Sequence, residues 1–157
     1  MKIKLLAIGI TDDKNLNALI ETYRARLKHY VKFDLEIIPD IKNVKNLSEK
    51  QQKEKEGELL LKKLQATDQL ILLDDKGKDF TSVEFSKYLQ KKMNSGIKQL
   101  VFVIGGPYGF SETVYKKSQG KVSFSKMTFS HQMIRLFVVE QIYRGFTILK
   151  NEPYHHE

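Results

Sequence analysis

Two uninterrupted apolar runs constrain the fold of this chain more than any other feature. They are QLILLD, residues 69–74, and QLVFVIG, residues 99–105. A strand with one face in water alternates apolar and polar residues, so runs without alternation predict strands that are covered on both faces. Helical patterns separate these strands from the others. This arrangement favours an α/β fold with a mostly parallel sheet and helices on both of its faces.

The other segments continue the alternation of strands and helices. Strand patterns are expected at 2–10 and 33–39 and, more weakly, near 121–125; helical patterns are expected at 15–31, 48–64, 82–94, about 131–149 and, as a short helix, after Ser111. The chain has 157 residues and shows no repeat, linker or low-complexity tract. It is therefore expected to form one domain, residues 1–157.

Short-range signals mark the ends of two of these helices. Ser48 with Gln51 and Thr81 with Glu84 have the spacing of capping boxes. Gly96 follows the second of these helices, where glycine can take the left-handed conformation that ends a helix.

Composition limits the class of protein. The net charge is +8, from 27 basic and 19 acidic residues, and such an excess commonly serves a polyanionic partner. Many lysines lie beside glutamates in residues 42–64, as on a solvated helix face, so the charge favours nucleic acid only modestly. There is no cysteine, which excludes disulfides and thiolate metal sites. The first apolar run is cut off by Thr11, Asp12 and Asp13, too early for a signal peptide, and no segment is long enough to span a bilayer. A cytoplasmic protein is expected.

A glycine-rich turn follows the strand pattern at 99–105. In an open parallel sheet, ligands bind at the carboxyl ends of the strands, where Gly105, Gly106 and Gly109 stand. Their spacing matches neither the dinucleotide fingerprint nor a P-loop. Two interpretations stay open: a turn that needs positive backbone angles, or a backbone that lets a flat ligand approach closely.

The C-terminal third carries two further features. The pattern from His131 to Leu149 is apolar almost all round, which indicates a helix buried on two sides, the second side by another subunit. Glu140 and Arg144 stand four residues apart on its remaining face, where they form either a functional pair or a surface ion pair of small energy. By contrast, the polar stretch after Leu72 is typical of a loop at a strand end.

Six segments, in this order, resemble one known family. They are LLAIG (5–9), KEKEGE (53–58), LDDKGK (73–78), IGGPYG (104–109), SFSKMTFSHQMIRLFVVEQIYR (123–144) and PYHHE (153–157). Together they are similar to the bacterial ribosomal RNA large-subunit methyltransferase H family, a single-domain group of the SPOUT class. The resemblance covers essentially the whole chain.

The resemblance implies a fold, a reaction and a set of binding residues. The fold is a SPOUT-type α/β sheet whose C-terminal part forms a trefoil knot, in a homodimer that pairs through the C-terminal helix. The reaction is methylation of N3 of a pseudouridine in 23S rRNA, on the assembled ribosome, with S-adenosyl-L-methionine (SAM) as methyl donor and without a metal. The expected cofactor-binding residues are Leu73, Gly105, Phe124, Ser125, Lys126, Met127, Thr128 and Phe129.

The reaction suggests which other residues act. N3 of a uracil-type ring carries a proton, so a base, or a cation that favours the deprotonated ring, would help. Positions matching the family offer Glu140, Arg144, Tyr154 and His155, with Tyr154 and His155 as a substrate clamp, and His131 as a further candidate that ranks below His155. The proton acceptor stays open among them.

Other polar residues of this region rank lower. His131 is interpreted as a helix-capping or packing residue, and Arg135, like Arg144, suits phosphate or carboxylate recognition. Ser130 stands where the family often has proline, and serine should still cap the helix. His156 stands where relatives often carry a basic residue.

Two alternatives come from other functional classes. The chain could be a non-catalytic basic RNA-binding or ribosome-binding protein, or a SPOUT methyltransferase that acts on tRNA. Saturable binding of SAM distinguishes the enzymes from the first alternative, and the labelled RNA distinguishes the two enzymes.

Overall fold

The computed structural model describes residues 1–156. Its five strands form one sheet in the order β2-β1-β4-β3-β5, and all pairings between these strands are parallel. The strands are β1 (Lys2–Ile8), β2 (Lys32–Ile38), β3 (Gln69–Asp79), β4 (Gln99–Ile104) and β5 (Gly120–Ser123). The helices are α1 (Lys14–Leu27), η1 (Val44–Asn46), α2 (Glu49–Leu61), α3 (Ser82–Asn94), α4 (Glu112–Lys117) and α5 (His131–Leu149). The predicted α/β class with a parallel sheet is confirmed.

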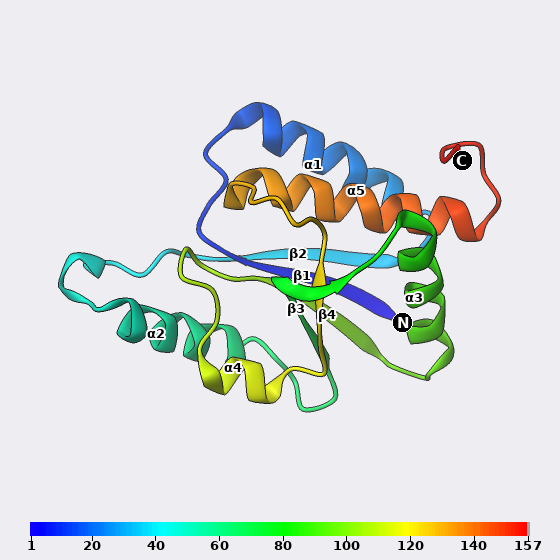
Figure 1. The fold of residues 1–157 in the computed structure, drawn as a ribbon. Coiled ribbons are helices and arrows are strands. Elements are labelled where there is room, and N and C mark those ends of the chain that lie inside the picture. Colours follow the sequence, from blue (N-terminus) through cyan, green and yellow to red (C-terminus); the bar gives the residue numbers. More distant parts are fainter. Residues whose placement is uncertain (157) are drawn as a thin grey trace.

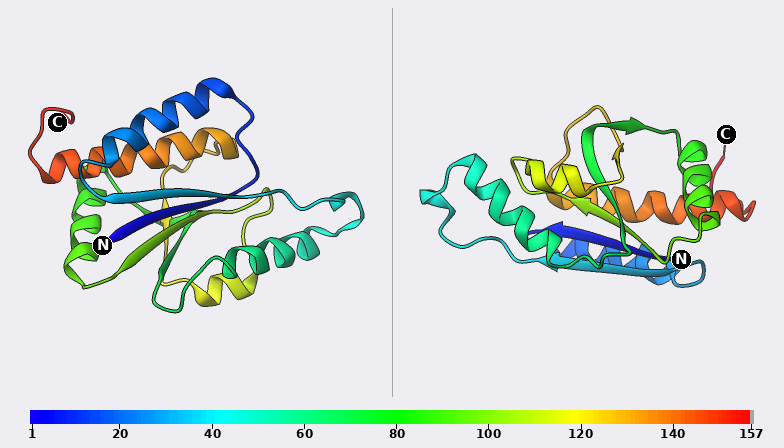
Figure 2. Two further views of the ribbon diagram at one scale, coloured as in Figure 1. Left: turned by 180° about the vertical axis from the view of Figure 1, so that it is seen from behind. Right: turned by 90° about the horizontal axis from the view of Figure 1, so that it is seen from below.

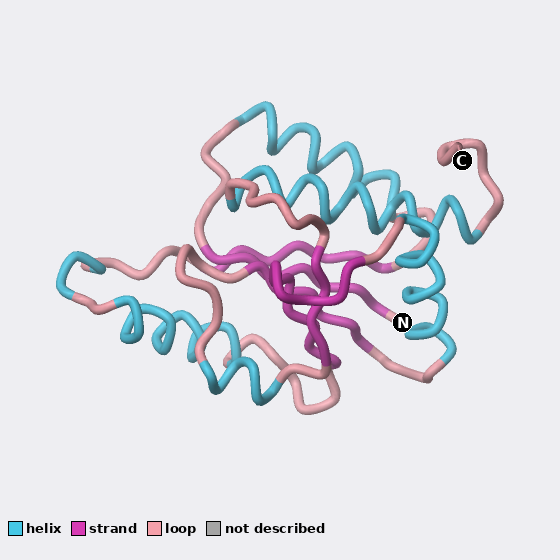
Figure 3. Tube along the Cα trace, in the orientation of Figure 1, coloured by secondary structure: helices cyan, strands magenta, loops and turns pink. Residues whose placement is uncertain are grey.

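Helices cover both faces of the sheet, as the apolar runs predicted. α1, α3 and α5 pack on one face, where Leu100 and Phe102 of β4 point into the larger core. α2 and α4 lie side by side on the other face, over Val101 and Val103 of the same strand (Figures 1 and 2). The strands therefore lie between two groups of helices (Figure 3), and consecutive residues of β4 are buried on opposite sides.

The helix boundaries follow from local chemistry. The capping boxes at Ser48 and Thr81 are both formed. Gly96 has a φ of +76° directly after the last turn of α3, as expected for a glycine that ends a helix. Ser130 caps α5, because its hydroxyl accepts a hydrogen bond from the backbone N–H of Met133.

β3 is longer than its apolar run. The stretch after Leu72, expected as a loop, continues the strand to Asp79 and pairs a second time with β5. Both Leu73 and Lys78 are in register with Val122, so the residues between them form an irregularity in the strand. Gly77 permits this second pairing of β3 with β5, because any side chain there would be too close to β5: a Cβ would lie 2.6 Å from the backbone carbonyl carbon of Val122.

Gly77→Ala is accordingly expected to lower the free energy of unfolding by about 2 kcal/mol, because the added methyl group would clash with backbone atoms, which cannot change rotamer as a side chain can. Urea denaturation measures the change. Gly120→Ala in β5 is the matched control, because its Cβ would first meet a side-chain atom of Ile71, at 3.4 Å. Equal stabilities of the two variants would contradict the close approach of Gly77 to the backbone of β5.

Between β5 and α5 the chain passes from one face of the sheet to the other. α4 precedes β5 and contacts α2, whereas α5 contacts α1 and α3 on the opposite face. This passage is consistent with the C-terminal trefoil knot, which stays a prediction. Within residues 1–156, no helix has the length and apolar character needed to cross a membrane.

Candidate active site

The sheet register brings three chain segments to one edge. Leu73 of β3 is in register with Ile104 of β4 and also with Val122 of β5. The glycine turn follows Ile104 directly, and the loop at 124–130 follows β5. Because parallel strands end on the same side, both segments meet Leu73 at the carboxyl edge of the sheet.

These segments enclose a cavity of about 420 Å³. Among the residues lining it are the following predicted cofactor-binding residues: Leu73, Gly105, Phe124, Ser125, Met127, Thr128 and Phe129. Lys126 belongs to the same loop but is not part of the lining. His131, interpreted from the sequence as a capping or packing residue, also lines the cavity, at the first turn of α5.

The glycine turn has the positive backbone angle that the first interpretation expected, and the close approach of a flat ligand stays a prediction. Gly109 has a φ of +78° and its N–H donates to the carbonyl of Gly106 at 3.1 Å, which closes the turn. Gly105 is needed for close packing, since a Cβ there would lie 3.0 Å from the ring of Phe110. The turn also forms part of the cavity wall.

A carboxylate in the cavity was not predicted. Asp74 accepts hydrogen bonds from the hydroxyl of Tyr115 and from the N–H of Lys76. Burial alone would disfavour its charge, but these hydrogen bonds and the nearby Lys121 hold the pKa of Asp74 below its usual value. The cavity therefore contains a fixed negative charge. The sequence could not identify this carboxylate, because two adjacent aspartates at a strand end are a weak signal. The hydrogen-bonding partner Tyr115 is also 41 residues away along the chain.

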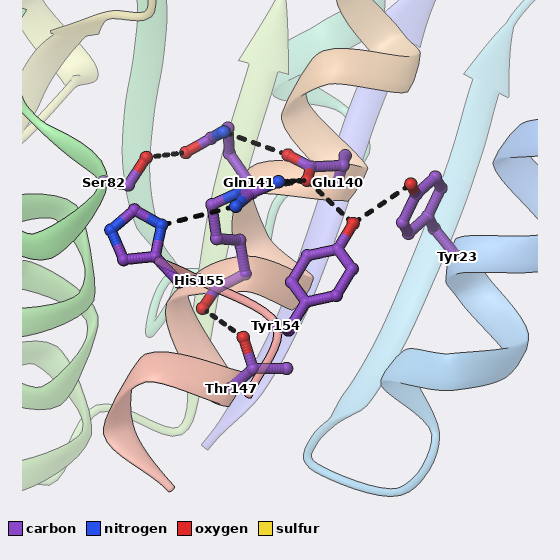
Figure 4. A network of polar contacts seen from close by, with 8 residues as sticks. Tyr23, Ser82, Glu140, Gln141, Thr147, Tyr154 and His155 are labelled. Atoms are coloured by element: carbon purple, nitrogen blue, oxygen red, sulfur yellow. Dashed lines mark hydrogen bonds and ion pairs between the residues drawn. The ribbon is translucent and has the colours of Figure 1, made fainter. Parts of the chain in front are cut away.

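The predicted catalytic residues form one polar network on α5 and the C-terminal tail (Figure 4). Arg144 donates to Oε1 of Glu140 through Nε at 3.0 Å and Nη2 at 2.6 Å. The hydroxyl of Tyr154 donates to the same oxygen at 3.0 Å, and the guanidinium of Arg144 lies 4.7 Å from the centre of the Tyr154 ring. Nη1 of Arg144 lies 3.3 Å from Nδ1 of His155.

Helix α1 and the turn after it hold the tail in place. The hydroxyl of Tyr23 in α1 lies 3.1 Å from that of Tyr154, and Tyr30, between α1 and β2, donates a hydrogen bond to Glu152. Burial, and then the hydrogen bonds with Tyr23 and Glu140, raise the pKa of Tyr154. Tyr154 therefore stays protonated near neutral pH and acts as a hydrogen-bond donor.

Gln141 connects the network to the first residue of α3. Its amide donates to Oε2 of Glu140 at 2.9 Å and accepts from the hydroxyl of Ser82, also at 2.9 Å. Both Ser82 and Gln141 line a second cavity of about 280 Å³, which shares residues 122–125 with the wall of the first. The two cavities therefore share part of their walls, and Gln141, which binds Glu140, lines the second cavity, although none of the four predicted catalytic residues lines either of them.

Arg135 does not have the role expected from its residue type. Its side chain is only 1% exposed and donates to the carbonyl of Ile8 and the hydroxyl of Thr11, both at 2.7 Å. Burial lowers the pKa of its guanidinium. Arg135 therefore joins α5 to the end of β1, and the interpretation that it recognises phosphate is wrong.

His156, at the position where relatives often carry a basic residue, is exposed.

A parallel sheet with a cavity at its carboxyl edge is the arrangement in which α/β proteins commonly bind small ligands, and this chain has both features. Among residues 1–156, no cluster of three or more acidic or histidine side chains could hold a metal ion. Comparison with known families specifies the class further. Residues 1–155 match the family described as "Predicted SPOUT methyltransferase", and the chain belongs to this family.

Individual relatives are similar along the entire chain, and those described here are each named ribosomal RNA large subunit methyltransferase H. The protein from Flavobacterium johnsoniae is 76% identical over 157 residues, which is 100% of both chains. The one from Flavobacterium psychrophilum is 74% identical with the same coverage. The one from Christiangramia forsetii is 65% identical over 156 residues, or 99% of each chain.

Proposed function

We propose that this protein transfers a methyl group from SAM to N3 of a pseudouridine in large-subunit rRNA, on the assembled ribosome. The full-length similarity to proteins named for large-subunit rRNA methylation supports the substrate. One structural observation carries the proposal for this chain: all the expected cofactor-binding residues except Lys126 line a single cavity at the carboxyl edge of the sheet.

The chemistry of the cavity fits SAM. Phe124 and Phe129 provide flat apolar walls for an adenine ring, and the glycine turn provides backbone without side chains. Asp74, held in its charged form, suits a ligand that carries positive charge. When bound, SAM supplies a methyl group on a positively charged sulfur. The protein's part is to align the attacking nitrogen with that methyl group.

The polar network suits a ring that must lose its N3 proton. An arginine only donates hydrogen bonds, so Nδ1 of His155 accepts from Arg144 and a neutral His155 carries its proton on Nε2. Tyr154 is likewise a donor. Arg144 is therefore the group that would stabilise negative charge on the deprotonated ring, and Glu140 and His155 hold it in place.

We further propose a homodimer that pairs through α5. Met133 and Phe137 are each 37% exposed on the face of α5 that the chain's own core does not cover, and Phe129 packs against Phe137 beside them. Apolar side chains grouped in this way are typical of an interface. Pairing here would let one subunit bind the cofactor while the surface of the other contacts RNA.

Phe137→Asp is expected to weaken the dimer ~30-fold or more, because a twofold interface would bury the new carboxylate twice. Sedimentation equilibrium measures the dissociation constant. Leu19→Asp, at an exposed leucine of α1, is the control and should leave the dimer intact. A Phe137→Asp protein that remains a dimer would contradict pairing through this face.

The function is tested with labelled SAM. The purified protein is incubated with assembled ribosomes that lack the modification and, in parallel, with free rRNA and with tRNA. Label in large-subunit rRNA of assembled ribosomes alone is the expected result. Label in tRNA would overturn the substrate but keep the chemistry. A folded protein that labels no RNA would favour a non-catalytic RNA-binding protein.

A further inference from the structure

A buried carboxyl group lies directly beneath the glycine turn. Glu56 of α2 is 3% exposed. Its Oε1 accepts a hydrogen bond from the amide of Gln52 at 2.8 Å, and its Oε2 has no hydrogen-bond partner among residues 1–156. Buried carboxyl groups are rarely left half-satisfied, and nothing in the proposed reaction uses this one.

α2 is fitted closely to both ends of the turn. A Cβ on Gly106 would lie 2.2 Å from Oε2 of Glu56, so this carboxyl oxygen sits directly against the backbone of the turn. A Cβ on Gly57 would lie 2.5 Å from the hydroxyl oxygen of Ser111, the residue that caps α4 at the other end of the turn. Consecutive residues of α2 therefore support the beginning and the end of the segment from Gly106 to Ser111.

We propose that Glu56 is a positioning residue: its carboxyl group, placed against Gly106, holds the glycine turn in the conformation that forms one wall of the SAM cavity. This inference rests on the proposed function insofar as the cavity is taken to bind SAM. Glu56 itself does not line the cavity, so it acts through the turn.

The surroundings of Glu56 favour its uncharged form. Within residues 1–156 it belongs to no ion pair, and the charged groups that act on it are Asp40, after β2, and His131, on α5. Burial is the main cause that raises the pKa of Glu56; Asp40 adds to it, whereas Gln52 and His131 oppose it.

The direction of this shift sets a pH dependence. The stabilisation from uncharged Glu56 is fully present below the usual glutamate pKa of 4.5 and is lost as the pH rises through the raised pKa. Ionisation would leave a carboxylate with one hydrogen bond against the turn. We therefore expect the turn to loosen, and the affinity for SAM to fall, with rising pH.

The experiment compares Glu56→Gln, Glu56→Ala and the control Glu54→Ala, at an exposed glutamate of the same helix. Hydrogen exchange of the amides in residues 105–110 is measured without cofactor, and SAM affinity is measured by calorimetry from pH 4.5 upward to pH 9. Glu56→Ala should speed exchange in the turn and weaken SAM binding about tenfold. Glu56→Gln should bind like the wild type at low pH and lose the decline at high pH. Glu54→Ala should change neither measurement.

Different results would overturn the positioning role of Glu56 and the proposal that the cavity binds SAM. If the wild type binds SAM but Glu56→Ala keeps the same affinity and the same exchange rates, the positioning role is overturned. A Glu56→Gln protein as impaired as Glu56→Ala would also overturn it, because a charged group would then be required. If Glu56→Ala loosens the turn while the wild type gives no saturable heat with SAM, the cofactor is wrong and the positioning role stands.

Discussion

Arg144→Ala is expected to lower kcat for methyl transfer about 100-fold or more while leaving the affinity for SAM unchanged. Arg144 makes three polar contacts, two to Glu140 and one to His155, and lies over the ring of Tyr154. Its loss removes the cation that would stabilise a deprotonated base. It also leaves the carboxylate of Glu140 without its ionic partner.

Single-turnover kinetics with saturating SAM and unmodified ribosomes measures this effect, and calorimetry measures cofactor binding separately. Arg24→Ala is a close control, since Arg24 also pairs with a glutamate one turn away, Glu21, but on the surface of α1. It should change kcat little. Equal losses in the two variants, or a loss of SAM binding in Arg144→Ala, would argue against the proposed role.

Gly106→Ala is expected to weaken SAM binding about 100-fold. The φ of Gly106 is not in the left-handed region, so alanine can adopt the backbone, and the cost is steric. Its Cβ would lie 2.2 Å from Oε2 of Glu56 and 2.7 Å from the carboxyl carbon, and must displace either the carboxyl group or the turn.

A double variant identifies the cause of that loss. Removing the carboxyl group in Gly106→Ala/Glu56→Ala makes room for the methyl group, so its affinity should return to that of Glu56→Ala alone. Losses that simply add would show that Gly106 is needed for another reason, such as direct contact with the cofactor.

The order of strands and helices could be predicted from the sequence, because apolar runs and helix caps are signals between residues that are close along the chain. The apolar runs gave the buried strands, and the caps at Ser48, Thr81 and Ser130 are all formed. Glu140, Arg144, Tyr154 and His155 are named as candidates from a resemblance, and hydrogen bonds link all four in the structure.

What could not be predicted depends on contacts between distant segments. The polar residues after Leu72 look like a loop, and only pairing with β5 makes them a strand. Glu56 stands in a run of charged residues typical of a solvated face, yet it is buried by a turn some fifty positions further along. The residue type of Arg135 is typical of anion binding, but its side chain is buried and donates to the carbonyl of Ile8 at the end of β1.

The strand order has a consequence for how the chain reaches its native state. β1 lies between β2 and β4, with Lys2 in register with Lys32 on one side and with Gln99 on the other. During synthesis the first strand must therefore wait for the second half of the chain before its other edge is paired. Such non-local pairing slows folding, and an unpaired apolar edge invites association with other chains. Until β4 emerges, a nascent chain of this protein therefore exposes one apolar edge of β1 that has no partner strand within the chain.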